Sequence, residues 1–276
     1  FILSANSLLS AALGFVFWVI ASRIYSIEDI GISVAIISSI SLIALLARMG
    51  FDQSIIKYLP NSNKNFVIGT SLIISTLLVV VIGIIFLLGI NIWSPSLSII
   101  QQYWFIFLFI VIIYSILSLL GTTFIALRSA QLYLYQNLLI NSRILFIFLL
   151  VSLGVSGILI SYGLSFFLGC IFSIIILLKM NIKPFYFNFG FLKDSFNFSI
   201  SNHIISILNS IPMLILPIMI LNLQNAEATS LYYISYTIVS ILLIIPGSMS
   251  VSLFVEGSHD NIDSSHFLKS FTLVFL

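Results

Sequence analysis

Long apolar runs separated by short polar breaks constrain this chain more than any other feature. The runs are about 20 residues long, which is the length that an α-helix needs to cross the hydrocarbon core of a bilayer. Only 7% of the 276 residues are charged and 61% are hydrophobic, whereas a soluble domain carries roughly a quarter charged residues. Membrane barrel strands would instead alternate apolar and polar residues. The sequence therefore predicts an all-α integral membrane protein of the cell membrane.

Hydropathy predicts eight complete spans and part of a ninth. They lie at about 2–22, 30–49, 66–92, 102–126, 132–153, 157–179, 196–221 and 229–254, with the partial one from about 264. Breaks after even-numbered spans carry Arg48, Lys57, Lys64, Arg128, Lys179, Lys183, Lys193 and Lys269, and those after odd-numbered spans carry only Arg23. Since cytoplasmic loops hold the excess of Lys and Arg, we expect a cytoplasmic N-terminus. Both chain ends resemble cuts, so a fragment of a longer protein is expected.

The fifth span is unusually polar for a membrane helix. Gln136, Asn141 and Arg143 all fall inside it, and Arg143 is placed near mid-membrane. A charged side chain there costs at least about 2.5–3.5 kcal/mol, so it must face protein or water. The alternatives are a structural arginine, which caps carbonyls or pairs with an acid, and a binding residue. We favour binding, because intramembrane charges are usually functional.

The first and seventh spans each carry a polar stripe at helical spacing. In the seventh span it consists of Ser199, Asn202, His203, Ser206, Asn209 and Ser210, and in the first of Asn6, Ser7, Ser10 and Gly14. Such a stripe either packs on another helix through hydrogen bonds or lines a water-filled cavity. We favour the cavity. Pro212 and Pro217 should kink the seventh span.

A weak internal similarity relates these two spans. Asn6 and Ser10 align with Asn202 and Ser206 at an offset of 196 residues. A repeat of six spans preserves orientation and predicts two parallel lobes, as in two-lobed transporters. We therefore expect a first lobe at 1–180, a cytoplasmic interfacial linker at 181–195, and the start of a second lobe at 196–276. The polar faces of spans 1 and 7 should then meet across a central cavity.

The break at 46–60 has its own signature. Gly50 can end or bend a helix, and Pro60 stops the next one. Between them, Ile55, Ile56 and Leu59 predict the apolar side of a short helix at the membrane surface.

Two stretches of the chain resemble prokaryotic polysaccharide flippases of the Wzx type. They are Ala21-Ser-Arg-Ile-Tyr-Ser-Ile-Glu-Asp-Ile-Gly31 followed by Arg48-Met-Gly-Phe-Asp-Gln-Ser-Ile-Ile-Lys-Tyr58, and the stretch from Ser230 to Pro246-Gly-Ser-Met-Ser. The superfamily also includes multidrug and toxin extrusion transporters and the peptidoglycan-precursor flippase. The resemblance implies two lobes around a V-shaped cavity, alternating access, and transfer of a lipid-linked oligosaccharide to the outer leaflet. One departure is Asn209, which stands where the superfamily often carries an acid in span 7.

A lipid-linked glycan needs neutral hydrogen-bonding groups for its sugars and a cation for its phosphates. The predicted cavity residues are Arg143, Gln136, Asn141, Asn6, Ser10, Asn202, His203, Ser206 and Asn209, with Arg23, Arg48, Asp52 and Lys57 at its mouths. The expected partners are this substrate, membrane lipid and glycan-assembly proteins.

Other function classes fit the sequence less well. A cation-coupled drug exporter is expected to carry acidic residues within its spans. Here all eight acidic residues lie in or beside polar breaks. A membrane glycan polymerase or ligase requires catalytic groups, and the sequence shows no candidate nucleophile, carboxylate pair or metal cluster. A purely structural membrane subunit would not need the buried Arg143. With a net charge of +2 and one cysteine, Cys170, the sequence indicates no nucleic-acid partner, disulfide or cofactor.

Overall fold

The structure is a computed structural model that describes residues 2–259, and every regular element in this part is a helix. The long helices are α1 (Ile2–Ile24), α2 (Ile27–Arg48), α4 (Lys64–Trp93), α5 (Trp104–Ala126), α8 (Val155–Lys179), α9 (Phe189–Leu223) and α10 (Ala226–His259). The shorter ones are α3 (Phe51–Tyr58), α6 (Ala130–Asn141), α7 (Arg143–Leu149) and the 3-10 segments η1 (Pro95–Tyr103) and η2 (Val151–Leu153). The predicted all-α fold is confirmed.

Six helical segments in the described part are long and apolar enough to cross a membrane, and the bent helix α9 makes a seventh. They match the first seven predicted spans. The eighth lies within α10, and the ninth falls outside the described residues. Helix α9 bends by 43° between Phe189–Ile211 and Met213–Leu223. The bend lies at the first of the two prolines that predicted it, because a proline in a helix interior removes a hydrogen bond and clashes with the preceding turn.

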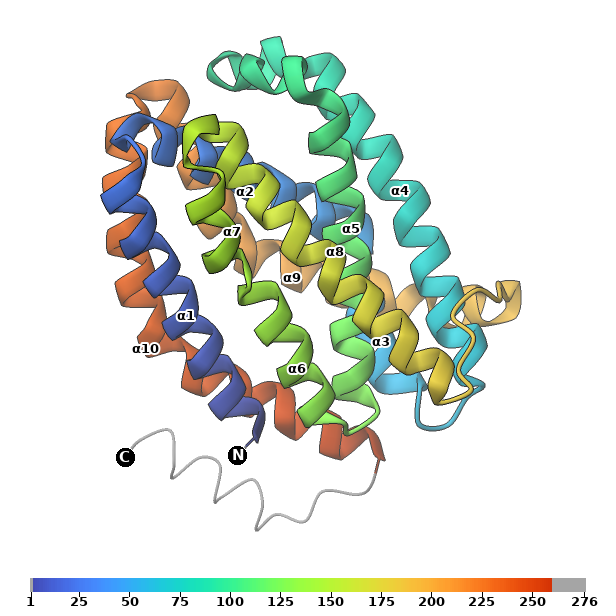
Figure 1. Ribbon diagram of the computed structural model, residues 1–276. Coiled ribbons are helices and arrows are strands. Elements are labelled where there is room, and N and C mark those ends of the chain that lie inside the picture. The colour runs from blue at the N-terminus through green and yellow to red at the C-terminus, as the bar shows by residue number, and fades with distance from the viewer. Residues whose placement is uncertain (1, 260–276) are drawn as a thin grey trace.

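The spans alternate in direction, so the breaks gather at two ends of the bundle. In Figure 1 the N-terminus and the breaks after α2, α5 and α8 lie at the lower end. The breaks after α1, α4, α7 and α9 lie at the upper end. Helices α1 and α10 stand side by side at one flank and α4 and α5 at the other, and each of these pairs is in contact.

Helix α2 is the central element of this bundle. Its most apolar stretch is 72% buried, against 17% for α1, and it packs against α4, α5, α8, α9 and α10. Two glycines allow the closest of these contacts. A Cβ on Gly31 would overlap the backbone of Ala226, and one on Gly50 would overlap the carbonyl oxygen of Ser199. The first residue of α10 is therefore in backbone contact with the first turns of α2, and α9 is in backbone contact with the turn that follows α2.

The turn after α2 explains how the chain reverses there. Met49 and Gly50 both adopt left-handed backbone conformations, with φ of 45° and 75°. Glycine takes such a conformation without steric cost. The predicted short helix follows as α3, and Ile55, Ile56 and Leu59 are buried, with α3 packed against α5 and α9. The apolar side of this short helix thus faces the protein.

The fifth predicted span differs from the uninterrupted helix expected over 132–153. It is broken into α6, α7 and η2, with a turn at Ser142. Ser142 donates its hydroxyl to the carbonyl of Leu139 at 2.6 Å, and Asn141 donates its amide to the carbonyl of Asn137 at 2.8 Å. Short polar side chains that bond to nearby carbonyls compete with regular helix and often bend it. Arg143 therefore lies at a helix break.

Candidate functional site

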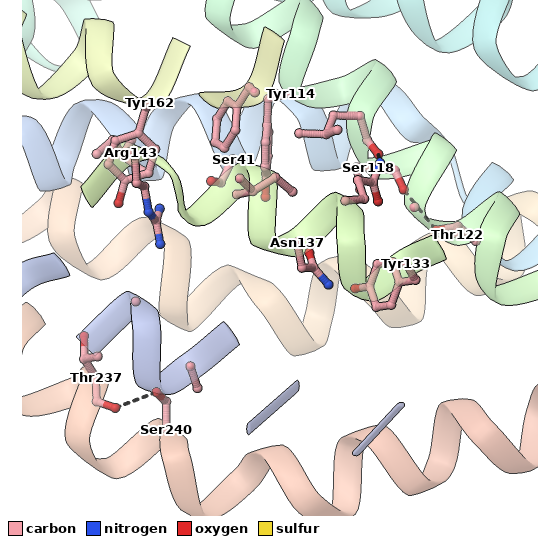
Figure 2. A pocket seen from close by; sticks show the side chains of 18 of the residues that line it. Ser41, Tyr114, Ser118, Thr122, Tyr133, Asn137, Arg143, Tyr162, Thr237 and Ser240 are labelled. Atoms are coloured by element: carbon pink, nitrogen blue, oxygen red, sulfur yellow. Dashed lines mark hydrogen bonds between the residues drawn. The ribbon is translucent and has the colours of Figure 1, made fainter. Parts of the chain in front are cut away.

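A cavity of about 560 Å³ opens between the membrane helices. Helices α5, α6, α7 and α8 form one wall, and α1, α2 and α10 contribute the rest. Its polar lining consists of Ser41, Arg48, Tyr114, Ser118, Thr122, Tyr133, Gln136, Asn137, Arg143, Tyr162, Tyr233, Thr237 and Ser240. In Figure 2 the labelled side chains extend from opposite walls, with Thr237 and Ser240 of α10 across the open space from Asn137 and Arg143. In a membrane span, polar groups in this number mark a hydrated space.

Arg143 supplies the cation of the inner cavity. Its guanidinium carbon lies 4.4 Å from the ring centroid of Tyr162 and 4.9 Å from that of Phe17. Its Nη2 donates a weak hydrogen bond to the Asn141 side-chain oxygen at 3.4 Å, its side chain also interacts with the Tyr162 hydroxyl, and its buried Nε has no hydrogen-bond partner. Figure 2 shows the guanidinium pointing into the cavity.

No acid forms an ion pair with this guanidinium in the part of the chain that the structure describes, and Asp52 pairs with Arg48 instead. Aromatic faces stabilise a cation without satisfying its N–H donors. An arginine carries five such donors in a planar fork that suits phosphate or carboxylate. Arg143 is therefore held against aromatic rings, and the donors of its guanidinium that face the cavity can bind an anion.

Aromatic rings form a continuous wall around Arg143. Trp18 packs edge-on against Phe17 and Tyr233, with ring centroids 5.2 Å apart in each pair. Tyr162 packs edge-on against Phe17 at 5.3 Å. These contacts join α1, α8 and α10 around one point of the cavity. Rings that brace one another in this way resist rearrangement, so the guanidinium is presented in a fixed position.

Gln136 lies at the wall and ties three helices together. Its side-chain amide donates to the Leu117 carbonyl at 3.1 Å and to the Ser173 hydroxyl at 3.0 Å, and the residue is 1% exposed. A Cβ on Gly121 would lie 2.7 Å from the Gln136 side-chain oxygen, so glycine leaves room for that oxygen. The geometry gives Gln136 a structural role, with one edge at the cavity.

The predicted mouth residues separate into two groups. Arg48 lines the cavity and donates to the Ser118 hydroxyl at 2.7 Å, with the Asp52 carboxylate 3.8 Å away. Lys57 is exposed on α3, with its ammonium 3.9 Å from the ring centroid of Phe198. Arg23 is exposed at the other end of the bundle. Arg48 is thus the second cation that reaches the cavity.

The structure does not bring the polar faces of α1 and α9 together at this cavity. Helix α1 packs mainly against α6 and α10, whereas α9 packs mainly against α2 and α10. Ser199 at the start of the α9 stripe is buried, and its hydroxyl lies 2.6 Å from that of Ser54 in α3. Four further α9 positions, which are Asn202, His203, Ser206 and Asn209, are half-buried or exposed and do not line the cavity.

The polar face of α1 reaches the cavity only in part. Ala11, Gly14 and Trp18 line it, Ser10 is half-buried one residue away from the lining, and Asn6 is 1% exposed. Neither polar atom of the Asn6 amide has a hydrogen-bond partner.

Several lining residues were not predicted from the sequence, although their helical spacing is visible in it. Tyr114, Ser118 and Thr122 follow a spacing of four on α5, and Tyr233, Thr237 and Ser240 follow a spacing of four and three on α10. Each set lies on one face of its helix. These stripes carry serine, threonine and tyrosine, which are less conspicuous in a membrane span than Asn, His or Arg.

The fold and cavity define a helical membrane protein with a polar, aromatic-walled internal site. Within residues 2–259, no group of three or more His, Cys, Asp or Glu side chains is placed to hold a metal ion. Comparison with protein families matches residues 1–254 to the family described as polysaccharide biosynthesis protein, so the chain belongs to that family. Comparisons with curated proteins and with solved structures found no match.

Proposed function

We propose that the protein is a flippase that carries a lipid-linked oligosaccharide from the cytoplasmic to the outer leaflet. The observation that carries this proposal is the Arg143 guanidinium, stacked on aromatic rings and without an acidic partner among the described residues, inside a polar cavity among membrane-spanning helices. Membership of a polysaccharide biosynthesis family supports a glycan intermediate as the cargo. A flippase has to hide a charged, hydrophilic headgroup from hydrocarbon, and this cavity offers such a space.

The parts of the site correspond to the parts of the substrate. A phosphate or pyrophosphate would accept hydrogen bonds from Arg143, since charge-assisted bonds of this kind are the strong ones. The hydroxyls of Ser118, Thr122 and Ser240 and the amide of Asn137 would bond to sugar hydroxyls. The polyprenyl tail is apolar and can remain in lipid while the headgroup crosses. The site therefore requires no apolar tunnel of its own.

The distribution of lysine and arginine supports one orientation of the bundle in the membrane. At the lower end in Figure 1, the described breaks and helix ends carry Arg48, Lys57, Lys64, Arg128, Lys179, Lys183 and Lys193, and the upper end carries Arg23. By the positive-inside rule, we infer that the lower end and the N-terminus are cytoplasmic. Arg48 would then meet the headgroup on its way in, and Arg23 on its way out.

Two helix pairings support the two-lobed arrangement and alternating access that we infer for the protein. Helix α1 contacts α10, and α2 contacts α9. A six-span repeat would map α1 onto α9 and α2 onto α10, so that it exchanges these two pairings. This is the relation expected for lobes at 1–180 and 196–276 about an axis along the membrane normal, joined by the linker at 181–195. Separation of α9 from α2 and α3 would then expose the Asn202–Asn209 stripe to the path.

The test is complementation of a prokaryote that lacks its polysaccharide flippase, with surface glycan as the readout. The full-length protein should restore the glycan, and Arg143→Ala should abolish restoration while Arg143→Lys retains part of it. Membrane insertion is checked by a fluorescent C-terminal fusion. Normal glycan with Arg143→Ala would contradict the phosphate role. A protein that inserts, restores nothing and lowers drug accumulation would instead be an exporter.

A further inference from the structure

A second, almost entirely apolar hollow lies on another face of the bundle. This crevice of about 300 Å³ is lined by Leu72, Ile73, Thr76 and Leu77 of α4, Ile116 and Leu120 of α5, Ile174 of α8, and Pro184 and Phe185 of the segment that follows α8. Its α4 residues lie within four turns of Lys64, where that helix begins. The crevice therefore opens near the end of the bundle that carries most of the lysines.

The segment 182–188 forms a fixed roof over this crevice. The backbone N–H of Lys183 donates to the Asn65 side chain at 2.8 Å, and that of Asn188 donates to the Thr70 hydroxyl at 2.9 Å. Between these two bonds, a Cβ on Gly69 would overlap the backbone of Tyr186. The segment thus lies directly on the first turns of α4, which positions Pro184 and Phe185 over the crevice.

Three exposed lysines lie on the segments that border this roof. Lys64 is the residue before Asn65, Lys183 is the residue before Pro184, and Lys179 ends α8. An apolar slot next to such a basic border has the two features of a phospholipid site. Lysines near a membrane surface attract anionic headgroups, and a slot of this kind takes an acyl chain.

Helix α5 separates the crevice from the central cavity. Ile116 and Leu120 line the crevice, whereas Leu117 and Gly121 line the cavity. Successive residues on a helix point about 100° apart, so the two hollows use different faces of α5. A substrate with its headgroup in the central cavity would therefore not place its tail in this crevice.

We propose that the crevice binds an anionic phospholipid of the leaflet that surrounds this end of the protein. One acyl chain occupies the slot beneath Phe185, and the headgroup phosphate lies against Lys64, Lys179 and Lys183. The bound lipid fastens the 182–188 segment to α4 and α8. This site is independent of the transport function proposed above, and its test does not depend on transport.

The test uses the full-length protein in nanodiscs with phospholipids whose acyl chains carry a photoreactive diazirine. The probes are phosphatidylglycerol, which is anionic, and phosphatidylethanolamine with the same chains. Adducts are mapped by mass spectrometry. We expect phosphatidylglycerol to label the α4 and α5 peptides that line the crevice at least about five-fold more strongly, which is the gain expected for one lysine near the headgroup.

Two matched pairs of variants separate the acyl site from the headgroup site. Thr76→Trp fills the slot and should abolish labelling, whereas Val81→Trp, at a half-exposed position outside the slot, should not. Combined Lys64→Gln, Lys179→Gln and Lys183→Gln should remove the preference for phosphatidylglycerol while leaving labelling by both lipids. Lys193→Gln, on α9, should leave the preference intact.

Equal labelling by both lipids in the wild-type protein, or labelling that Thr76→Trp leaves unchanged, would overturn the proposal. So would labelling of the crevice by a photoreactive polyprenyl-linked glycan in place of phosphatidylglycerol, because the crevice would then belong to the substrate. The lysine variants keep the test decisive if Thr76→Trp fails to fold.

Discussion

The close contact between Gly50 and α9 provides a sharp test of how the two parts of the chain meet. Replacing Gly50 with alanine places a Cβ at a residue with φ of 75°, which costs about 1–2 kcal/mol for an L-residue. The same Cβ would overlap the carbonyl oxygen of Ser199, which is backbone and cannot rotate away. Overpacking of this kind adds about 1–3 kcal/mol. We therefore expect Gly50→Ala to destabilise the protein by about 2–5 kcal/mol.

The assay is thermal unfolding of the detergent-solubilised protein, followed by the fraction that stays monodisperse. A loss of this size should lower the midpoint by at least about 5 °C. The matched control is Gly83→Ala, because a Cβ there meets only the terminal Cδ2 of Leu108, at 2.8 Å, and that side chain can move. If Gly50→Ala and Gly83→Ala melt at the same temperature, the backbone contact between the α2–α3 turn and α9 is not present as described.

Three further predictions concern contacts between helices and the lining of the cavity. Gln136→Leu removes the two hydrogen bonds that join α6 to α5 and α8 and should cost about 1 kcal/mol in the same assay, whereas Gln131→Leu, at an exposed position, should cost nothing. Ser54→Cys combined with Ser199→Cys should form a disulfide, since the two hydroxyl oxygens lie 2.6 Å apart. Oxidation of this pair should block glycan export reversibly if α9 has to leave α3. Thr122→Cys should react with a water-soluble maleimide and lose that reactivity when lipid-linked glycan is added, and the wild-type protein, whose single cysteine is buried, serves as the blank.

Hydropathy alone located the helices well, because each span has to satisfy its backbone internally and therefore forms a helix wherever an apolar run is long enough. It also located Arg143, since a charge in such a run has few alternatives to facing protein or water. The break at Ser142 was not predicted, although Asn141 and Ser142 are residues whose side chains compete for backbone carbonyls.

The cavity itself could be predicted only in part. Helical periodicity shows that a span has a polar face, but it does not show which neighbour that face meets. Ser199 illustrates this limit, because its stripe packs near the turn at Gly50, which only the three-dimensional arrangement reveals. The hydroxyl stripes that begin at Tyr114 and Tyr233 also follow helical spacing, and they do line the cavity. Neither stripe could be assigned to the cavity before the packing of α5 and α10 was known.

The measurement that tests the central proposal most directly is translocation of a lipid-linked oligosaccharide by the purified full-length protein in liposomes. The glycan that reaches the far leaflet is detected by an added glycosidase that cannot cross the membrane. The wild-type protein should accelerate this transfer, and Arg143→Ala should weaken the apparent affinity for substrate about ten- to a hundred-fold, as the loss of a charge-assisted hydrogen bond does. Equal transfer by the wild-type protein, Arg143→Ala and protein-free liposomes would contradict the assignment of this cavity as the path of the glycan.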